Sequence, residues 1–227
     1  AKKPGWVKWG AMAACLAVVL VVGVFSVSQQ RNQISLSNNS ANVVAYYTNN
    51  PFIFTNGSGS LIPLTEEELF TTFNTAIFMG TVSEIRNIVV NFDGDKAYRA
   101  IAEIEVEQVY RGPCSAGETI SVMLPCPLVK GFWVTDTSTV SAMEVGTTGI
   151  FMPMIYDDEN SIWEQNGAKL DVRDIADYGF ADGERFVFLE TEDSLVFSRD
   201  AYSSIANATT LDEVEDYIET MLESLNS

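Results

Sequence analysis

The sequence predicts a mainly β fold, a small antiparallel barrel with long loops and flanking helices, and three observations indicate it. Residues 97–110 alternate between apolar and polar side chains, as in a strand with one buried face. The apolar segment 76–90 has Gly80 in its interior, which suits a strand that bends as a small barrel closes. Residues 211–225 repeat apolar side chains at helical spacing, which predicts an amphipathic C-terminal helix.

The two long strands are expected to form a hairpin, because Asp93 and Gly94 supply a typical tight turn between them. In the second strand Gln108 interrupts the alternation, so a bulge there would return Val109 to the inner face. A third strand is predicted at 119–124. The second half of the chain is expected to add strands at 149–156, 185–190 and 195–197.

Two shorter helices are also expected. Thr65 and Glu68 have the spacing of a capping box, in which each side chain bonds the backbone of the other residue. This signal predicts a short helix over 66–73. Another helix is predicted over 170–178, ended by Gly179.

The C-terminal helix begins with the same capping signal, since Thr210 and Glu213 repeat the spacing. Its apolar stripe consists of Leu211, Val214, Ile218, Leu222 and Leu225. We expect the stripe to pack against the same domain, and the alternative is the groove of a partner protein.

A long apolar run, 10–27, indicates an N-terminal transmembrane helix. Its length as a helix is about 27 Å, which just crosses the hydrocarbon core of a bilayer. Lys8 and Trp9 stand directly before it, as expected at a positive cytoplasmic edge with an aromatic belt. We therefore expect a single-pass protein with a cytoplasmic N-terminus and an extracytoplasmic C-terminal domain. The alternative is a signal peptide cleaved near 26–28, which would give a secreted protein.

This interpretation divides the chain into four parts. Residues 1–9 form the cytoplasmic edge and residues 10–27 the transmembrane helix. Residues 28–60 are rich in Ser, Asn and Thr, so we expect a flexible polar linker, with a short edge strand at 43–47. Residues 61–227 form the extracytoplasmic domain.

The charge balance excludes several functions. The chain has 13 Lys and Arg against 31 Asp and Glu, a net charge of −18, and every acidic residue lies at Glu66 or later. Such a domain repels phosphate backbones, so we expect no nucleic-acid binding. The chain has no histidine, which excludes Ser-His-Asp and Cys-His nucleophile systems and histidine zinc sites.

Three groups of acidic residues are candidate sites. Glu103, Glu105 and Glu107 share one strand face and could supply the paired carboxylates of a glycoside hydrolase, but three acids at this spacing favour a solvated sheet face. The turns at 157–160 and 91–95 are rich in oxygen ligands, yet neither has the ligand spacing of an EF-hand. We expect no catalytic, cofactor-binding or metal-binding residue, and no enzyme.

Cys114 and Cys126 form the one possible disulfide outside the membrane segment. The predicted strand at 119–124 alone separates them by roughly 17 to 20 Å. A disulfide requires Cα atoms within about 7 Å of each other. We therefore expect free thiols.

Three segments carry a resemblance to a known class of fold. The strings at 76–82, 102–112 and 117–122 resemble the first three strands of an OB-type barrel of the netrin-like class, which includes the tissue inhibitors of metalloproteinases. The resemblance implies an OB-like fold, and a protease-inhibitor-like module is one function it implies. Those inhibitors have an N-terminal cysteine that reaches the protease metal and a disulfide framework, and this sequence has neither.

The N-terminal stretch 2–16 is similar to the anchors of small uncharacterised surface proteins of Gram-positive anaerobes. Some of those proteins carry a short cytoplasmic segment ahead of the anchor, with a suspected role in regulating transcription. Because the first residue is Ala1 and not methionine, we expect processing or further sequence upstream.

The leading hypothesis is a membrane-anchored extracytoplasmic module that binds or senses a protein or cell-wall ligand. One form of this hypothesis makes the module part of a transmembrane signalling protein. A secreted or anchored hydrolase that uses carboxylates is one alternative. A protease-inhibitor-like module is another.

Overall fold

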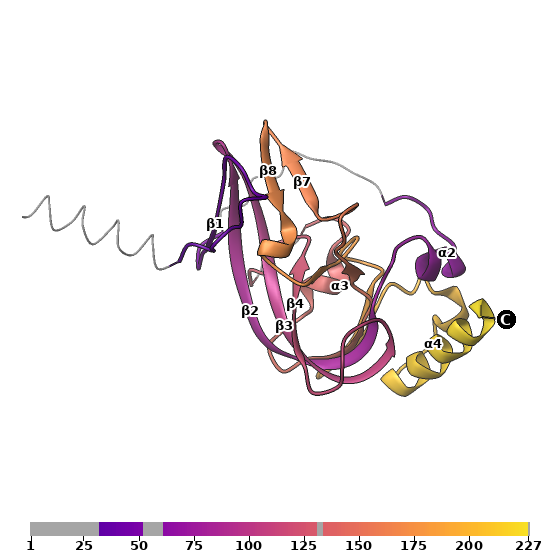
Figure 1. Ribbon diagram of the computed structural model, residues 1–227. Coiled ribbons are helices and arrows are strands. Elements are labelled where there is room, and N and C mark those ends of the chain that lie inside the picture. Colours follow the sequence, from indigo (N-terminus) through magenta and orange to yellow (C-terminus); the bar gives the residue numbers. More distant parts are fainter. Residues whose placement is uncertain (1–31, 52–60, 131–133, 227) are drawn as a thin grey trace, which may run out of the picture.

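The computed structural model describes residues 32–51, 61–130 and 134–226. Within these residues the fold is mainly β, with a strongly curled sheet that forms a half-barrel and a helix at the C-terminal end (Figure 1). The predicted transmembrane helix over 10–27 lies outside the described residues. No helix in the described part of the chain is long and apolar enough to span a membrane.

The strands in chain order are β1 (Val43–Tyr47), β2 (Ile77–Phe92), β3 (Asp95–Arg111), β4 (Thr119–Leu124), β5 (Thr148–Phe151), β6 (Met154–Ile155), β7 (Ile162–Gln165), β8 (Ala168–Asp171), β9 (Tyr178–Gly179), β10 (Val187–Glu190) and β11 (Leu195–Val196). The helices are α2 (Glu66–Thr71), α3 (Ser138–Ser141) and α4 (Leu211–Leu225), with single 3-10 turns η1 (Val172–Asp174) and η2 (Ser203–Ile205).

The main sheet has the strand order β11-β10-β5-β2-β3-β4-β9-β6, and β1 pairs separately with β2. Neighbouring strands are antiparallel except β4 and β9, which run parallel. An isolated bridge between Met154 and Thr75 joins β6 to the chain just before β2. Strands β7 and β8 form a separate two-stranded hairpin.

The hairpin of β2 and β3 is the longest feature of the sheet and confirms the predicted turn. Asp93 and Gly94 have φ values of 47° and 101°, the left-handed backbone that a tight hairpin turn requires. The register skips one residue between the pairs Met79 with Gln108 and Gly80 with Val106. The extra residue is therefore Glu107 and not the predicted Gln108. These irregularities increase the local twist and help the sheet to curl.

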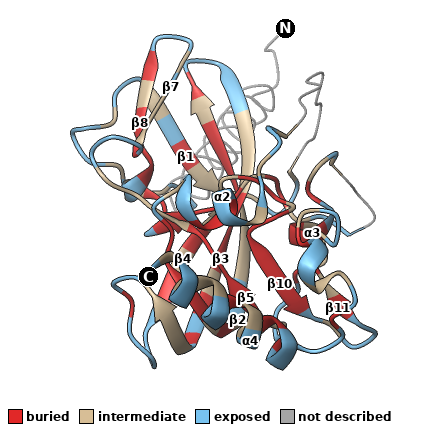
Figure 2. Cartoon of the chain, turned by 90° about the vertical axis from the view of Figure 1, so that its right-hand side faces the viewer, coloured by how far each residue is buried: buried red, intermediate tan, exposed pale blue. Residues whose placement is uncertain are grey.

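The larger core lies inside the curled sheet, and α4 covers it. Its biggest fully buried side chains are Phe70, Phe78, Phe151, Phe186, Phe188 and Tyr202. The α4 helix packs against β5 and β10 and buries Leu211, Val214 and Ile218 (Figure 2). The prediction that the apolar stripe packs on its own domain is confirmed, as is the capping box of Thr210 and Glu213.

The smaller core lies under the β7–β8 hairpin, where that hairpin covers β1 and the turn-side half of β2 and β3 (Figure 1). Its buried residues are Ala45, Ile88, Val90, Phe92, Ile101, Ala168, Leu170, Val172, Ile175 and Ala176. Gln165 donates from Nε2 to the Asp95 carboxylate over 2.6 Å, which joins the tip of this hairpin to the β2–β3 hairpin.

The helix predicted over 170–178 is wrong, because this region belongs to β8, η1 and β9. The reason lies in Asn166 and Gly167, which have φ values of 52° and 75° and turn the chain into a hairpin. Because β8 pairs with β7, every second residue of β8 points into the smaller core, and these residues therefore form a strand and not a helix.

The strand predicted at 149–156 is divided into β5 and β6. Pro153 stands between them and has no backbone N–H to give to the sheet. Its carbonyl still accepts from the N–H of Ala76 over 3.0 Å, so the chain stays beside the start of β2. The other predicted strands appear as β4, β10 and β11, and the short helix predicted after Thr65 appears as α2 with its capping box.

The predicted flexible linker over 28–60 needs correction for its described residues, 32–51. Residues 43–47 form β1, as predicted, and pair with β2 along their whole length. Ser37 and Ser40 donate to the Asp174 carboxylate, and Ala41 bridges to Lys169 of β8. Because its backbone groups find partners on the sheet and on β8, this segment is part of the folded body.

Candidate functional site

Glu103, Glu105 and Glu107 lie along β3, and two of them, Glu103 and Glu107, contact side chains of β2. Arg86 donates to Glu103 over 3.0 Å and also contacts Glu84 at 3.4 Å. Thr81 donates to Glu107 over 2.6 Å. This is the cross-strand network of a solvated sheet face.

The two oxygen-rich turns use their side chains to hold the backbone. The Asp157 carboxylate accepts the N–H groups of Glu159 and Asn160, and the side-chain oxygen Oδ1 of Asn91 accepts the N–H of Gly94. In the ranges that the structure describes, no group of three or more Cys, Asp or Glu is placed to hold a metal ion.

Cys114 and Cys126 are buried free cysteines, as predicted. Burial raises the pKa of both thiols, because it disfavours the charged thiolate. Since the thiolate is the nucleophile, these two thiols are poorly reactive at neutral pH.

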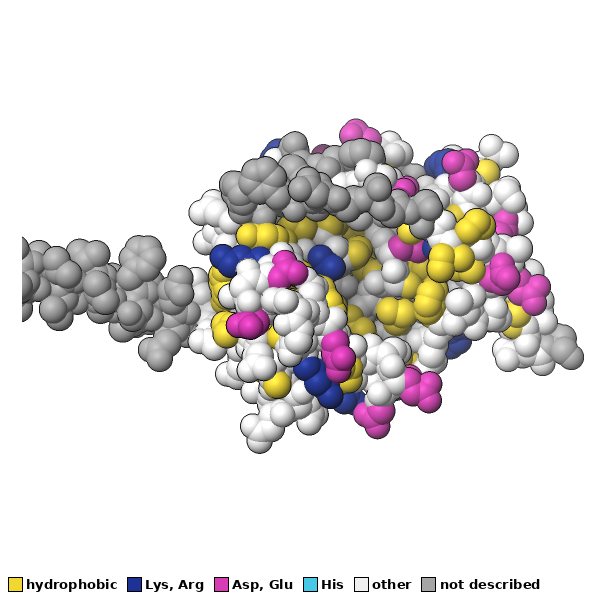
Figure 3. All heavy atoms as spheres, turned by 90° about the horizontal axis from the view of Figure 1, so that it is seen from above, with side chains coloured by type: hydrophobic (Ala, Val, Ile, Leu, Met, Phe, Trp, Pro, Cys, Tyr) yellow, Lys and Arg dark blue, Asp and Glu magenta, His cyan; other side chains and the backbone are white. Residues whose placement is uncertain are grey.

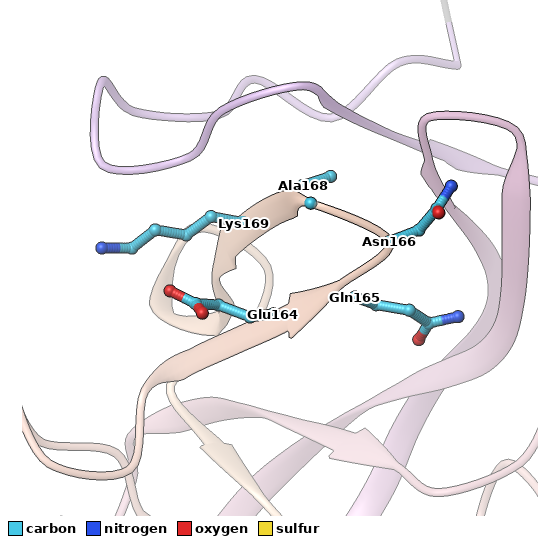
Figure 4. Close-up of a pocket in the computed structure, with 6 residues that line it drawn as sticks. Glu164, Gln165, Asn166, Ala168 and Lys169 are labelled. Atoms are coloured by element: carbon cyan, nitrogen blue, oxygen red, sulfur yellow. The ribbon is translucent and has the colours of Figure 1, made fainter.

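An open depression of about 410 Å³ lies at the tip of the β7–β8 hairpin. It is lined by Glu164, Gln165, Asn166, Gly167, Ala168 and Lys169. Figure 4 shows the side chains of Gln165 and Asn166 pointing away from those of Glu164 and Lys169, so the polar groups do not converge on one point. Gln165 and Asn166 also hydrogen-bond the tip of the β2–β3 hairpin. The lining residues therefore join two turns and form no enclosed binding pocket.

A different polar group stands out at the edge of the smaller core. Arg99 of β3 is partly buried, and its guanidinium carbon lies 4.9 Å from the centre of the Trp163 ring on β7. Trp163 in turn packs on Phe92, with ring centres 4.7 Å apart. Burial lowers the pKa of Arg99, although an arginine stays charged in proteins.

The partners of Arg99 differ from those of the other arginines in the described residues. Arg86, Arg173 and Arg185 form ion pairs with carboxylates. Arg111 and Arg199 each donate to two or more backbone carbonyls.

Arg99 has one hydrogen bond within the described residues, from Nη1 to the carbonyl of its neighbour Tyr98, over 2.8 Å. Every Asp and Glu of the chain lies in the described ranges, and none forms an ion pair with Arg99.

The sequence placed Arg99 on the polar face of its strand without assigning it a role. Only the β7–β8 hairpin, which the sequence did not predict, brings Trp163 over it. The end of the molecule that carries this hairpin is hollowed beside it, and hydrophobic side chains are visible in the hollow (Figure 3). No family model, no curated protein and no solved structure matches this chain.

Proposed function

We propose that the chain is a single-pass membrane protein whose extracytoplasmic domain binds a protein or cell-wall ligand. The observation that carries this proposal is the apolar run 10–27 with Lys8 and Trp9 before it, which suits a retained membrane anchor. From Arg31 onward ten basic residues stand against 31 acidic ones, a charge that suits an exposed, soluble body.

We further propose that this body is an OB-type barrel. The path β2-β3-β4-β9-β6 returns to the start of β2 through the bridge between Thr75 and Met154. With β4 and β9 parallel, this path is consistent with the five-stranded Greek-key arrangement of that fold. The protease-inhibitor function of the netrin-like class is not part of the proposal, because the chain lacks the cysteine framework that it requires.

We propose binding in preference to catalysis because most of the candidate catalytic groups are either hydrogen-bonded within the fold or buried. Two of the three glutamates on β3 are held by side chains of β2, and both thiols are buried with a raised pKa. The chain has no histidine to serve as a general base near neutral pH.

Fractionation of cells that express the full chain tests the location. We expect the intact protein in the membrane pellet, and we expect protease added outside intact cells to digest its folded body. Val19→Arg with Val21→Arg should release the protein from the membrane, because two central charges make insertion unfavourable. Gln29→Arg with Gln30→Arg, just after the run, is the matched control and should leave the anchor in place.

Two outcomes would overturn this location. One is a wild-type product in the cytosol. The other is a soluble product in the medium whose mass shows that the residues up to Val27 have been removed.

A further inference from the structure

We propose that Arg99, held against Trp163, is the subsite for a carboxylate group of the ligand. This inference deepens the proposed binding function and rests on it, since it names the chemistry that the domain recognises. The site lies at the edge of the smaller core, between β3 and the β7–β8 hairpin.

The positive charge of Arg99 has no carboxylate side chain of the chain as an ion-pair partner. A partly buried cation is unfavourable unless an anion or several hydrogen-bond acceptors compensate it. The chain has 31 carboxylate side chains, yet none pairs with Arg99, whereas Arg86 on the neighbouring strand contacts two. A ligand that carries a carboxylate would supply the missing counter-charge.

The N–H donors of Arg99 have a geometry that suits a carboxylate. A guanidinium has five N–H donors in a planar fork, which suits a carboxylate held by two parallel hydrogen bonds. In the described residues Arg99 uses Nη1 toward the Tyr98 carbonyl, and Nε and Nη2 have no acceptor there. As far as the described residues show, these two groups are available to bind both oxygens of one carboxylate.

The guanidinium of Arg99 is held in place before any ligand arrives. The guanidinium carbon of Arg99 lies 4.9 Å from the centre of the Trp163 ring, and the Trp163 ring packs against the Phe92 ring. A preorganised donor loses less conformational entropy on binding than a free one. Tyr156 lies close enough that the charge of Arg99 lowers its pKa, although burial raises that pKa more.

The net charge of the domain favours a singly charged anion, such as a carboxylate, over a doubly charged one. From Arg31 onward the balance is −21, so a doubly charged phosphate would meet more repulsion than a carboxylate. The rings of Trp163 and Tyr156 near Arg99 favour a small apolar group beside the carboxylate. The end of a peptide chain and an acidic side chain share this chemistry, so the test includes both.

The test is a ligand-observed NMR titration of the full chain with four probes. N-acetylalanine presents a terminal carboxylate, and N-acetylglutamic acid α-amide presents a side-chain carboxylate. N-acetylalaninamide is the neutral control, and inorganic phosphate is the competing anion. We expect binding of at least one carboxylate probe, with the tighter one identifying the source, and much weaker binding of the other two.

Arg99→Gln should weaken that binding about tenfold or more, because a charge-assisted hydrogen-bonded pair is lost. Arg86→Gln removes the same charge from an arginine that also lies over an aromatic ring, Tyr47, and should change the affinity less than about twofold. If Arg99→Gln does not fold, Arg99→Lys takes its place, because it keeps the charge and loses the planar fork.

The proposal is overturned by equal losses in the Arg99 and Arg86 variants, by phosphate binding as tightly as the carboxylates, or by no binding of either carboxylate. Failure of the carboxylate subsite can be told apart from failure of the proposed membrane location. Arg99→Gln is expected to leave the membrane fraction and the protease sensitivity of the chain unchanged.

Discussion

The two cores of this domain differ in what covers them and in what they contain. The larger core is closed by α4, and the guanidinium groups at its edge have acceptors within the fold: Arg185, over the Phe186 ring, pairs with Asp182, and Arg199, over the Phe197 ring, donates to backbone carbonyls. The smaller core is covered by a hairpin of two four-residue strands, and the guanidinium at its edge, Arg99, has a single backbone acceptor within the described residues. We infer that the larger core supplies most of the stability and that the smaller core can therefore carry a binding group.

The largest effect is expected in the larger core. Phe151 is fully buried and stacks on Phe78, with ring centres 5.6 Å apart. Phe151→Ala should lower the free energy of unfolding by about 3 to 5 kcal/mol, measured by urea denaturation. The exposed Val145→Ala is the control and should change it by less than about 0.5 kcal/mol. A loss near that of the control would mean that the larger core is not the main source of stability.

A smaller effect is expected from the ring that covers the smaller core. Trp163 is only partly buried, so Trp163→Ala should lower the free energy of unfolding by about 2 kcal/mol, below the range for fully buried aromatic residues. Trp163→Phe keeps an aromatic ring beside Phe92 and should lose less. If Trp163→Ala destabilises the domain as much as Phe151→Ala, the proposed difference between the cores is incorrect.

The pH dependence should come in part from the contact between α2 and α4 at the edge of the larger core. Glu66 accepts hydrogen bonds from Ser203, the N–H of Ser204 and Tyr217, and these lower its pKa to about 2 against the opposing effect of burial. A lowered carboxyl pKa stabilises the fold above pH 4.5, and that contribution is lost as the pH falls toward 2.

Denaturation of the wild-type chain between pH 6 and pH 2 measures this effect, which we expect to be about 1 kcal/mol after solvent screening. In Glu66→Gln the fall should be shallower. The neighbouring Glu67→Gln is the control and should follow the wild type. Equal slopes in all three proteins would contradict the role of Glu66.

An effect of similar size, but confined to the smaller core, should come from the turn at Asn166 and Gly167. Gly167 has a φ of 75°, so Gly167→Ala introduces backbone strain of about 1 kcal/mol. Hydrogen exchange should show faster exchange in β7 and β8 and unchanged exchange in α4. Gly117, with a φ of 86° in the β3–β4 connection, gives a matched substitution that should leave β7 and β8 unchanged. Faster exchange in α4 of the Gly167 variant would show that the two cores open together.

Much of the larger core could be predicted from local signals. The capping boxes at Thr65 and Thr210 located α2 and α4, and alternation located β4 and most of β3. The smaller core could not be predicted in this way, because the β7–β8 hairpin that covers it depends on the turn at Asn166 and Gly167. The apolar spacing that follows this turn also fits a helix. The Asn-Gly pair was the available signal for that hairpin.

The environment of Arg99 could not be predicted from the sequence, for a different reason. Its position in an alternating strand indicates only a polar face. Its contact with Trp163 spans 64 positions of the chain and exists only after β7 and β8 have folded over β3. Local spacing holds no information about a contact of this range.

The most direct test of the account observes Arg99 itself. The Nε–Hε signals of the arginines in the full chain are recorded by NMR while N-acetylalanine or N-acetylglutamic acid α-amide is added. We expect the Arg99 signal to shift and saturate with the tighter probe, while the Arg86 signal stays in place. An Arg99 signal that does not move with either probe, or equal shifts of both signals, would contradict the account.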